Sequence, residues 1–262
     1  MREWLDVFIL GVIEGVTEFL PISSTGHMLL AKEWLTYKPS ELFLAVVQSG
    51  AVLAVLMVFA GRVRELCKNW RDKDNQQFVF KLLAAFMLTA VGGLILKKLD
   101  FELPENPTPV ALATLIGGFL ILLIEWAIRG KRLSETVTWP VALAVGAGQL
   151  LAVIFPGLSR SGTAILMAMA FGIARGPATE FSFLLGIPTL LSAGALKTYE
   201  AIKDQEHSVD WLLIGWGTFI AAVTAFIAVK WLLKFVQSHT FNGFGWYRII
   251  LGAAILLLLR FG

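Results

Sequence analysis

Long apolar stretches separated by short charged connections run through most of this chain. A helix that crosses the hydrocarbon core of a membrane needs about 20 mostly apolar residues. On that basis we predict six spanning helices, at about 41–61, 77–97, 108–128, 178–199, 211–236 and 245–261. The apolar runs are continuous and do not alternate with polar residues, which favours helices over the strands of a membrane barrel.

Two further apolar regions are interrupted by proline and hydroxyl-bearing residues. Region 3–35 contains the turn Pro21–Gly26, and region 138–174 contains the turn Pro156–Gly162. A helix usually ends before a proline, and a Ser or Thr after the break can cap the next helix. Each region is therefore predicted to form a pair of helices that enters the membrane and returns to the same side.

The two interrupted regions also resemble each other in spacing. The intervals between a glycine, a polar residue and a proline are the same in both: Gly11, Glu14 and Pro21 in one, Gly146, Gln149 and Pro156 in the other. We therefore predict one integral membrane domain, 1–262, with internal repeats at approximately 1–66 and 137–204. Chance similarity between two helix breaks is the alternative.

The charged connections predict on which side of the membrane each helix ends. Connections 62–73 and 129–135 are rich in Lys and Arg, which is typical of the cytoplasmic side. Connections 97–105 and 200–210 carry more acids and fit the outer side. With six spans, both termini then lie outside and the two helix pairs enter from opposite sides, as in an inverted-topology repeat.

Composition supports an all-α, polytopic membrane protein. Hydrophobic residues make up 57% of the chain and charged residues 16%, with a mean hydropathy of +0.74. A soluble domain carries more charge than this. The net charge of +3 is small and says little about acidic partners; we expect no nucleic-acid partner. The single Cys67 excludes a disulfide within the chain. We expect no removable signal peptide, because no small-residue cleavage site follows a short apolar core near the start of the chain. We expect no organic cofactor, since no Gly-rich nucleotide loop occurs.

Two carboxylates near the first break are the first candidates for chemistry. Glu14 and Glu18 are four residues apart, so they share one face of a helix. Ionisable residues at membrane depth are expensive and mark functional sites. Such a pair needs a cation, a proton or a metal nearby. Glu14 and Glu18 are expected either to orient His27 or to hold a divalent cation such as Mg²⁺ or Ca²⁺. The alternative is a helix at the interface with both carboxylates in water.

Three hydroxyls follow at the start of the next helix, with a histidine close behind. Ser23, Ser24 and Thr25 suit simple capping. A hydroxyl beside His27 also suits a nucleophile activated by a base. Amides at a helix start bind phosphate well, so capping and catalysis are compatible here.

The second break contains one isolated cation. Arg160 is the only charged residue between Glu135 and Arg175, and it is flanked by Ser159 and Ser161. A guanidinium offers paired donors that match a phosphate group. The alternative is an arginine that extends to the membrane surface. Its place inside the helix break favours a phosphate-binding role.

These motifs resemble one known family across essentially the whole chain. The stretches Glu14–His27 and Pro156–Gly162, together with those that begin at Gln48 and Glu180, resemble the bacitracin-resistance family of undecaprenyl-diphosphate phosphatases. The resemblance implies a multi-pass enzyme of the bacterial inner membrane with a site open to the periplasm. It would hydrolyse the C55 lipid diphosphate to the monophosphate, which is reused in peptidoglycan synthesis.

The resemblance also assigns roles to individual residues. It implies a serine nucleophile at Ser24, a histidine base at His27, acids at Glu14 and Glu18, and a phosphate-binding Arg160. The substrate-binding set is completed by Ser159, Ser161, Ser23, Thr25 and Gln149. Where the family pattern has a threonine this chain has Ala164, and Thr163 precedes it, so Thr163 receives no role.

Two alternatives stay open at the level of sequence. In one, water attacks the phosphorus directly, activated by a glutamate, and Ser24 only binds phosphate. In the other, the protein is a transporter or flippase of a phosphorylated polyprenyl lipid, because inverted repeats with broken helices are a transporter architecture. A transporter needs Arg160 but no nucleophile. The expected partners are the lipid substrate and membrane lipids, and a homodimer is compatible with the sequence.

Overall fold

In the computed structural model of this chain, residues 2–99, 106–204 and 209–261 are described, and their regular structure is helical. The elements, in chain order, are α1 (Arg2–Thr17), α2 (Ser24–Trp34), α3 (Glu41–Val58), α4 (Ala60–Lys68), α5 (Lys73–Lys98), α6 (Thr108–Ile128), α7 (Trp139–Ile154), α8 (Arg160–Ala170), α9 (Arg175–Lys203), α10 (Trp211–Phe235) and α11 (Asn242–Phe261). The all-α fold predicted from the sequence is confirmed.

The six predicted spans are also confirmed as long apolar helices. Helices α3, α5, α6, α9, α10 and α11 are each long and apolar enough to cross a membrane. The two interrupted regions form the helix pairs α1–α2 and α7–α8, with breaks where the sequence placed them. That these pairs are re-entrant, and that the two halves are inverted repeats, stay predictions.

One predicted connection is wrong in detail. The basic segment 62–73 was expected to be a loop, but α4 occupies Ala60–Lys68 and none of its residues is buried. Arg, Glu, Leu and Lys favour helix even where no core forms, because their straight side chains lose little freedom there. Part of the connection 97–105 predicted on the outer side, and part of 200–210, lie outside the described residues.

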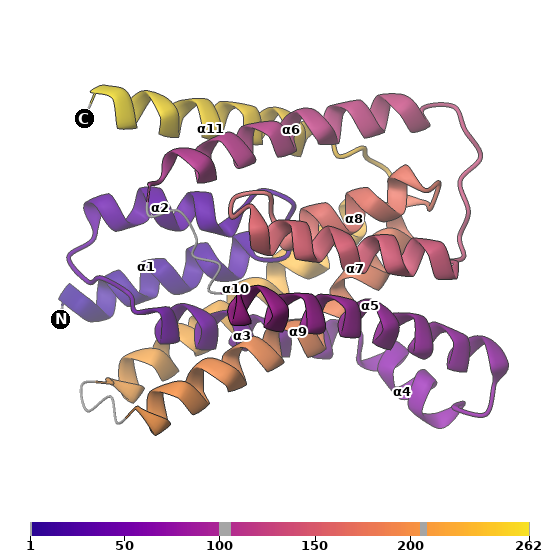
Figure 1. The fold of residues 1–262 in the computed structure, drawn as a ribbon, viewed down its shortest axis with the longest axis horizontal. Coiled ribbons are helices and arrows are strands. Elements are labelled where there is room, and N and C mark those ends of the chain that lie inside the picture. The colour runs from indigo at the N-terminus through magenta and orange to yellow at the C-terminus, as the bar shows by residue number, and fades with distance from the viewer. Residues whose placement is uncertain (1, 100–105, 205–208, 262) are drawn as a thin grey trace.

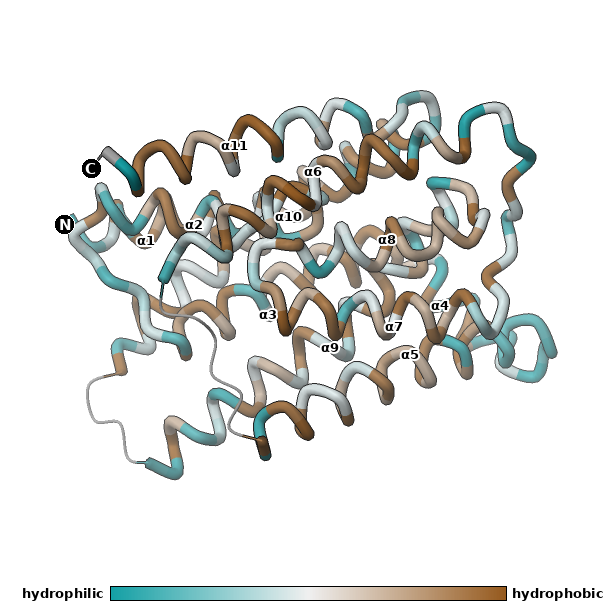
Figure 2. The backbone as a smooth tube through the Cα atoms, turned by 45° about the horizontal axis from the view of Figure 1, so that its top comes forward, coloured by the Kyte–Doolittle hydropathy of each residue, from teal (hydrophilic) through white to brown (hydrophobic). Residues whose placement is uncertain are grey.

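The helices run side by side along the long axis of the molecule (Figure 1). Both termini lie at one end, and α4 and the 129–138 connection lie at the other, as the predicted topology requires. Hydrophilic positions gather toward the two ends of the bundle, while the middle of most helices is hydrophobic (Figure 2). This distribution suits a bundle that crosses a bilayer.

Long helices surround each broken pair in the same way. Helix α10 packs on α1 and α3, and α5 packs on α7 and α9; α11 contacts α2, and α6 contacts α8. Helices α6 and α11 also pack on each other. Backbone that is not helical is tolerated at membrane depth only where protein or a water-filled cavity covers it. This arrangement supplies that cover for both breaks.

Close helix contacts depend on small residues. A Cβ atom added at Gly15 of α1 would overlap Thr224 and the Ala221 carbonyl of α10, and would lie 2.9 Å from the Ala225 nitrogen. Helices of membrane proteins commonly approach each other at such small residues. The position of α1, which carries Glu14 and leads to Glu18, therefore depends on glycine at position 15.

We predict that Gly15→Ala lowers the stability of the folded protein by about 1–3 kcal/mol, the usual cost of overpacking a filled interface. Thermal unfolding of the purified protein in detergent measures it. Gly93→Ala is the control, because a Cβ atom there meets nothing within 4 Å. Equal melting temperatures for the two variants would contradict the close approach of α1 and α10.

Candidate functional site

The first break is held by a serine with an unusual backbone conformation. Between α1 and α2 the chain turns at Pro21, and Ser23 caps α2 with its side chain accepting a hydrogen bond of 3.2 Å from the Gly26 amide. Ser23 has a φ of 72°, in the left-handed region that L-residues other than Gly, Asn and Asp rarely occupy. The expected capping role of Ser23 is present in the structure.

The second break has the same construction. Ser159 has a φ of 68° and caps α8 by accepting a hydrogen bond of 3.1 Å from the Gly162 amide. The residues after the two caps, Ser24 and Arg160, are the first residues of α2 and α8. The candidate nucleophile and the candidate phosphate ligand thus occupy equivalent positions in two equivalent turns.

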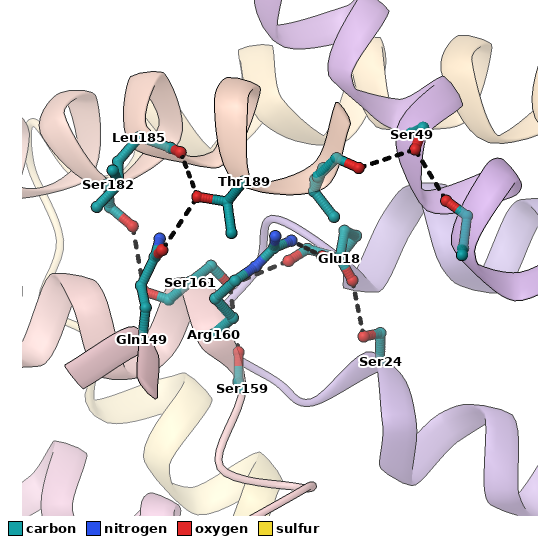
Figure 3. A network of polar contacts seen from close by, with 12 residues as sticks. Glu18, Ser24, Ser49, Gln149, Ser159, Arg160, Ser161, Ser182, Leu185 and Thr189 are labelled. Carbon is teal, nitrogen blue, oxygen red and sulfur yellow. Dashed lines mark hydrogen bonds and ion pairs between the residues drawn. The ribbon is translucent and has the colours of Figure 1, made fainter. Parts of the chain in front are cut away.

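A single carboxylate joins the two breaks (Figure 3). Glu18 Oε1 forms an ion pair with Arg160 Nη2, and Glu18 Oε2 accepts a hydrogen bond of 2.9 Å from Ser24 Oγ. The Glu18 side chain is 6% exposed and that of Arg160 is 18% exposed. Glu18, Ser24 and Arg160 therefore form one compact polar cluster, which the sequence had placed in two separate motifs.

Backbone contacts hold the second turn against the first. Ser161 Oγ donates to the Glu18 carbonyl at 3.0 Å and lies 3.3 Å from the Leu20 carbonyl. Thr114 of α6 lies between the breaks, with its Oγ1 3.3 Å from both Ser23 Oγ and the Gly157 carbonyl oxygen. Ser161, expected to bind substrate, thus bonds to the backbone of the first break.

His27 differs from its expected position beside the nucleophile. Its Nδ1 lies 2.8 Å from the Ser23 carbonyl oxygen, so this nitrogen is the donor. In a neutral imidazole Nε2 is then the acceptor, and it lies 2.6 Å from the Tyr247 hydroxyl. Its hydrogen-bond partners are therefore Ser23 and Tyr247, while the Ser24 hydroxyl donates to Glu18. Glu18 is the better placed base in this arrangement.

Glu14 is buried without a partner. Its residue is 0% exposed, and neither carboxylate oxygen has a hydrogen-bond partner among the described residues. It lines a small cavity of about 120 Å³ together with Thr25, Lys32 and Gln48. A buried carboxyl group without partners is costly, and such a group adjoining a polar cavity suits water or a cation.

Gln149 belongs to a neighbouring network. It is 1% exposed, and its Oε1 accepts a hydrogen bond of 3.2 Å from Thr189 (Figure 3). The same oxygen lies 3.5 Å from Thr89 Oγ1. No hydrogen bond between Gln149 and Arg160 occurs in the described part of the chain. Thr163 Oγ1 lies 3.0 Å from the Ser159 carbonyl oxygen, so it bonds within its own helix turn.

Two residues beside the site were not predicted from the sequence. Tyr247 contacts His27, with ring centroids 5.6 Å apart and planes 9° from parallel. Arg248 is fully buried on α11, next to both breaks. Arg248 is the only charged residue between Lys234 and Arg260. That isolation within an apolar span is the signal that could have identified it.

Comparison with known proteins identifies the class. The chain matches the family model described as "Bacitracin resistance protein BacA" over residues 7–254, and it belongs to that family. This chain is thus a polytopic membrane protein of that family, with a polar cluster between its two helix breaks.

Several similar proteins from different bacteria carry the same name. A protein of Rhizobium johnstonii named undecaprenyl-diphosphatase is 46% identical over 256 residues, which cover 97% of this chain and 96% of the relative. Proteins of the same name from Xylella fastidiosa and Xanthomonas oryzae pv. oryzae are 44% and 42% identical, each over 98% of the relative and over 98% and 99% of this chain.

We predict that Ser23→Ala destabilises the protein by about 1–2 kcal/mol, because it removes the cap and keeps a left-handed backbone at an L-residue. Ser23→Gly also loses the cap hydrogen bond but relieves the backbone strain, so it should be less destabilising. Melting temperatures in detergent measure both.

Ser40 provides the matched control for these variants. It caps α3 at a φ of −71° and accepts a hydrogen bond of 3.1 Å from the Phe43 amide, without left-handed strain. The difference between Ala and Gly should be larger at position 23 than at position 40. An equal difference would show that the left-handed conformation of Ser23 costs nothing.

Proposed function

We propose that this protein is an undecaprenyl-diphosphatase, which hydrolyses the terminal phosphate of the C55 lipid diphosphate to give the lipid monophosphate. The observation that carries the proposal is the cluster of Glu18, Ser24 and Arg160, to which the starts of α2 and α8 each contribute a residue. The names of the relatives support the same substrate.

The geometry suits binding of a diphosphate. Helices α2 and α8 both begin at the site, and the free amides of a helix start favour an anion. Arg160 adds a guanidinium whose paired donors match phosphate oxygens. In the absence of substrate this cation is neutralised by Glu18. A bound phosphate would take over part of that role and release Glu18 for proton transfer.

The hydrogen bond between Ser24 and Glu18 favours hydrolysis over transport. Glu18 would accept the proton of the Ser24 hydroxyl as the oxygen attacks the terminal phosphorus and the lipid monophosphate departs. Water would then release phosphate from Ser24. In the second version, Glu18 activates water directly. Phosphoryl transfer depends mainly on positioning and charge stabilisation, which this cluster supplies in both versions.

His27 would help to hold the start of α2, which carries Ser24, in its position. Its Nδ1–H holds the carbonyl of Ser23, the residue that caps α2, and its Nε2 accepts from Tyr247 of α11. The ring therefore ties the start of α2 to a spanning helix. Loss of His27 would loosen the turn that presents Ser24.

Glu14 is the residue that best fits a divalent cation. Its two oxygens have no hydrogen-bond partner among the residues that the structure describes, and Glu14 lines a cavity with Thr25, Gln48 and Lys32, whose ammonium group would compete with a metal ion. No group of three or more His, Cys, Asp or Glu side chains lies together in the described part of the chain, so substrate oxygens would have to complete the ligand set. Glu18 was expected to share this cation, but both of its oxygens already bind Arg160 and Ser24. Mg²⁺ or Ca²⁺ held at Glu14 would add positive charge beside the diphosphate.

We place the protein in the bacterial inner membrane, with the end that carries both termini on the periplasmic side. Lys and Arg concentrate at the opposite end, on α4 and the segment after it: Arg62, Arg64, Lys68, Arg71 and Lys73. Positive charge of this kind is typical of the cytoplasmic side. Formation of a homodimer stays a prediction.

The direct test is phosphate release from undecaprenyl diphosphate by the purified protein in detergent. We expect steady release, loss of release with a chelator, and recovery on addition of Mg²⁺ or Ca²⁺. Absence of hydrolysis, together with movement of the lipid diphosphate across vesicles, would favour the flippase. Hydrolysis that survives chelation would exclude a required cation at Glu14.

We predict that Arg160→Lys lowers kcat/KM by about 100-fold or more, since lysine keeps the charge but loses the paired donors that hold a phosphoryl group. Arg175→Lys is the control, because Arg175 pairs with Glu125 away from the cluster. Phosphate-release kinetics measure both. Near-normal turnover by Arg160→Lys would exclude the phosphate clamp.

We predict that Ser24→Ala abolishes hydrolysis if Ser24 attacks phosphorus, while Glu18→Gln slows it strongly in either mechanism. Rapid quench with labelled substrate looks for phosphate on the protein. Substantial steady hydrolysis by Ser24→Ala, with no labelled protein, would assign the attack to water. Activity of Glu18→Gln close to that of the unmodified protein would exclude Glu18 as the base.

The orientation is tested by labelling intact cells with a membrane-impermeant thiol reagent. Cys67, exposed on α4, should be protected. Glu33→Cys in a Cys67→Ala background, near the end of α2, should be labelled. The reverse pattern would place the basic end outside and overturn the proposed orientation.

A further inference from the structure

Arg248 of α11 is a fully buried arginine, with an exposed fraction of 0%. It forms none of the ion pairs found within residues 2–99, 106–204 and 209–261. A buried guanidinium is strongly unfavourable unless its donors are satisfied. The groups that accept hydrogen bonds from Arg248 therefore indicate its role.

Among the described residues, every hydrogen-bond partner of this guanidinium is a backbone carbonyl. On α6, Nε lies 3.1 Å from the Thr114 oxygen and Nη2 lies 3.4 Å from that of Ala113. In the first break, Nη1 lies 3.4 Å from the Pro21 oxygen. In the second break, Nη2 and Nη1 lie 2.9 Å and 2.8 Å from the oxygens of Gly157 and Leu158. One side chain thus binds both breaks and the helix beside them.

Three of the five bonded carbonyls, those of Pro21, Gly157 and Leu158, lie just ahead of the two helix caps. Pro21 precedes the cap Ser23 by two residues, and Leu158 directly precedes the cap Ser159. A shift in either turn moves the first residue of the helix that follows, which is Ser24 in one case and Arg160 in the other. The planar fork of arginine holds several acceptors at fixed relative positions.

We propose that Arg248 is a positioning residue, which fixes the two breaks relative to each other and so sets Ser24 and Glu18 against Arg160. It is fully enclosed and acts through the backbone, without touching the substrate. The inference rests on the proposed hydrolysis and assigns to that site a residue from a distant part of the chain.

Glycine at position 117 of α6 leaves the space that the guanidinium occupies. A Cβ atom at Gly117 would overlap Arg248 Nη2 and lie 2.5 Å from Cζ. A substitution there displaces Arg248 while it leaves every charge in place. Gly117→Ala is therefore a second way to disturb the same contacts.

The experiment compares Arg248→Lys, Gly117→Ala and the unmodified protein in steady-state hydrolysis of undecaprenyl diphosphate. Lysine keeps the charge but cannot span all five carbonyls. Misplacement of reacting groups by about 1 Å can cost about 100-fold in rate. We expect both variants to fold, with kcat about 10- to 100-fold lower and KM within about 3-fold, because the misplaced groups act in the transition state.

Arg175→Lys and Gly93→Ala are the controls, since both lie outside the cluster and should keep kcat. Unchanged kcat in Arg248→Lys would overturn the proposal, as would a loss confined to KM. If neither Arg248→Lys nor Gly117→Ala gives folded protein, Arg248 serves the fold as a whole and the positioning role is wrong. Absence of hydrolysis by the unmodified protein would refute the proposed function instead.

Discussion

The ion pair between Glu18 and Arg160 is the interaction on which the rest of the structure depends. Each charge comes from a different helix break, and each would be strongly unfavourable alone in an apolar bundle. Removal of one partner from a buried pair typically costs about 3–5 kcal/mol, because the other charge is left uncompensated. The two breaks must therefore meet, and Ser24 is brought to the same carboxylate by its own hydrogen bond.

Helix starts without cover are costly in an apolar bundle, and the helices around α2 and α8 supply that cover. Helices α5 and α10 cover α7 and α1, while α6 and α11 cover α8 and α2. The caps Ser23 and Ser159 satisfy one amide each. Arg248 binds carbonyls of both turns. Two helix starts and one paired guanidinium are thus held together inside a bundle whose long helices are apolar.

Much of this could be predicted from the sequence, because apolar length and proline position act locally. The spans and both breaks follow from such local signals, and so does the importance of Glu18 and Arg160. Contacts between distant segments could not be predicted. His27 was predicted to act on Ser24, only three residues away. In the structure, its Nε2 contacts the hydroxyl of Tyr247, 220 residues along the chain. Helix α4 was missed because its charged sequence has no buried face to produce an apolar pattern.

We propose that the two breaks form one catalytic unit through Glu18 and Arg160. A double-mutant cycle on kcat/KM tests it most directly, with Glu18→Gln, Arg160→Gln and the double variant measured against the unmodified protein. Residues that act as a unit lose activity non-additively. We expect the double variant to lose little more kcat/KM than the more severe single variant. Losses that add in full, as for independent sites, would contradict it.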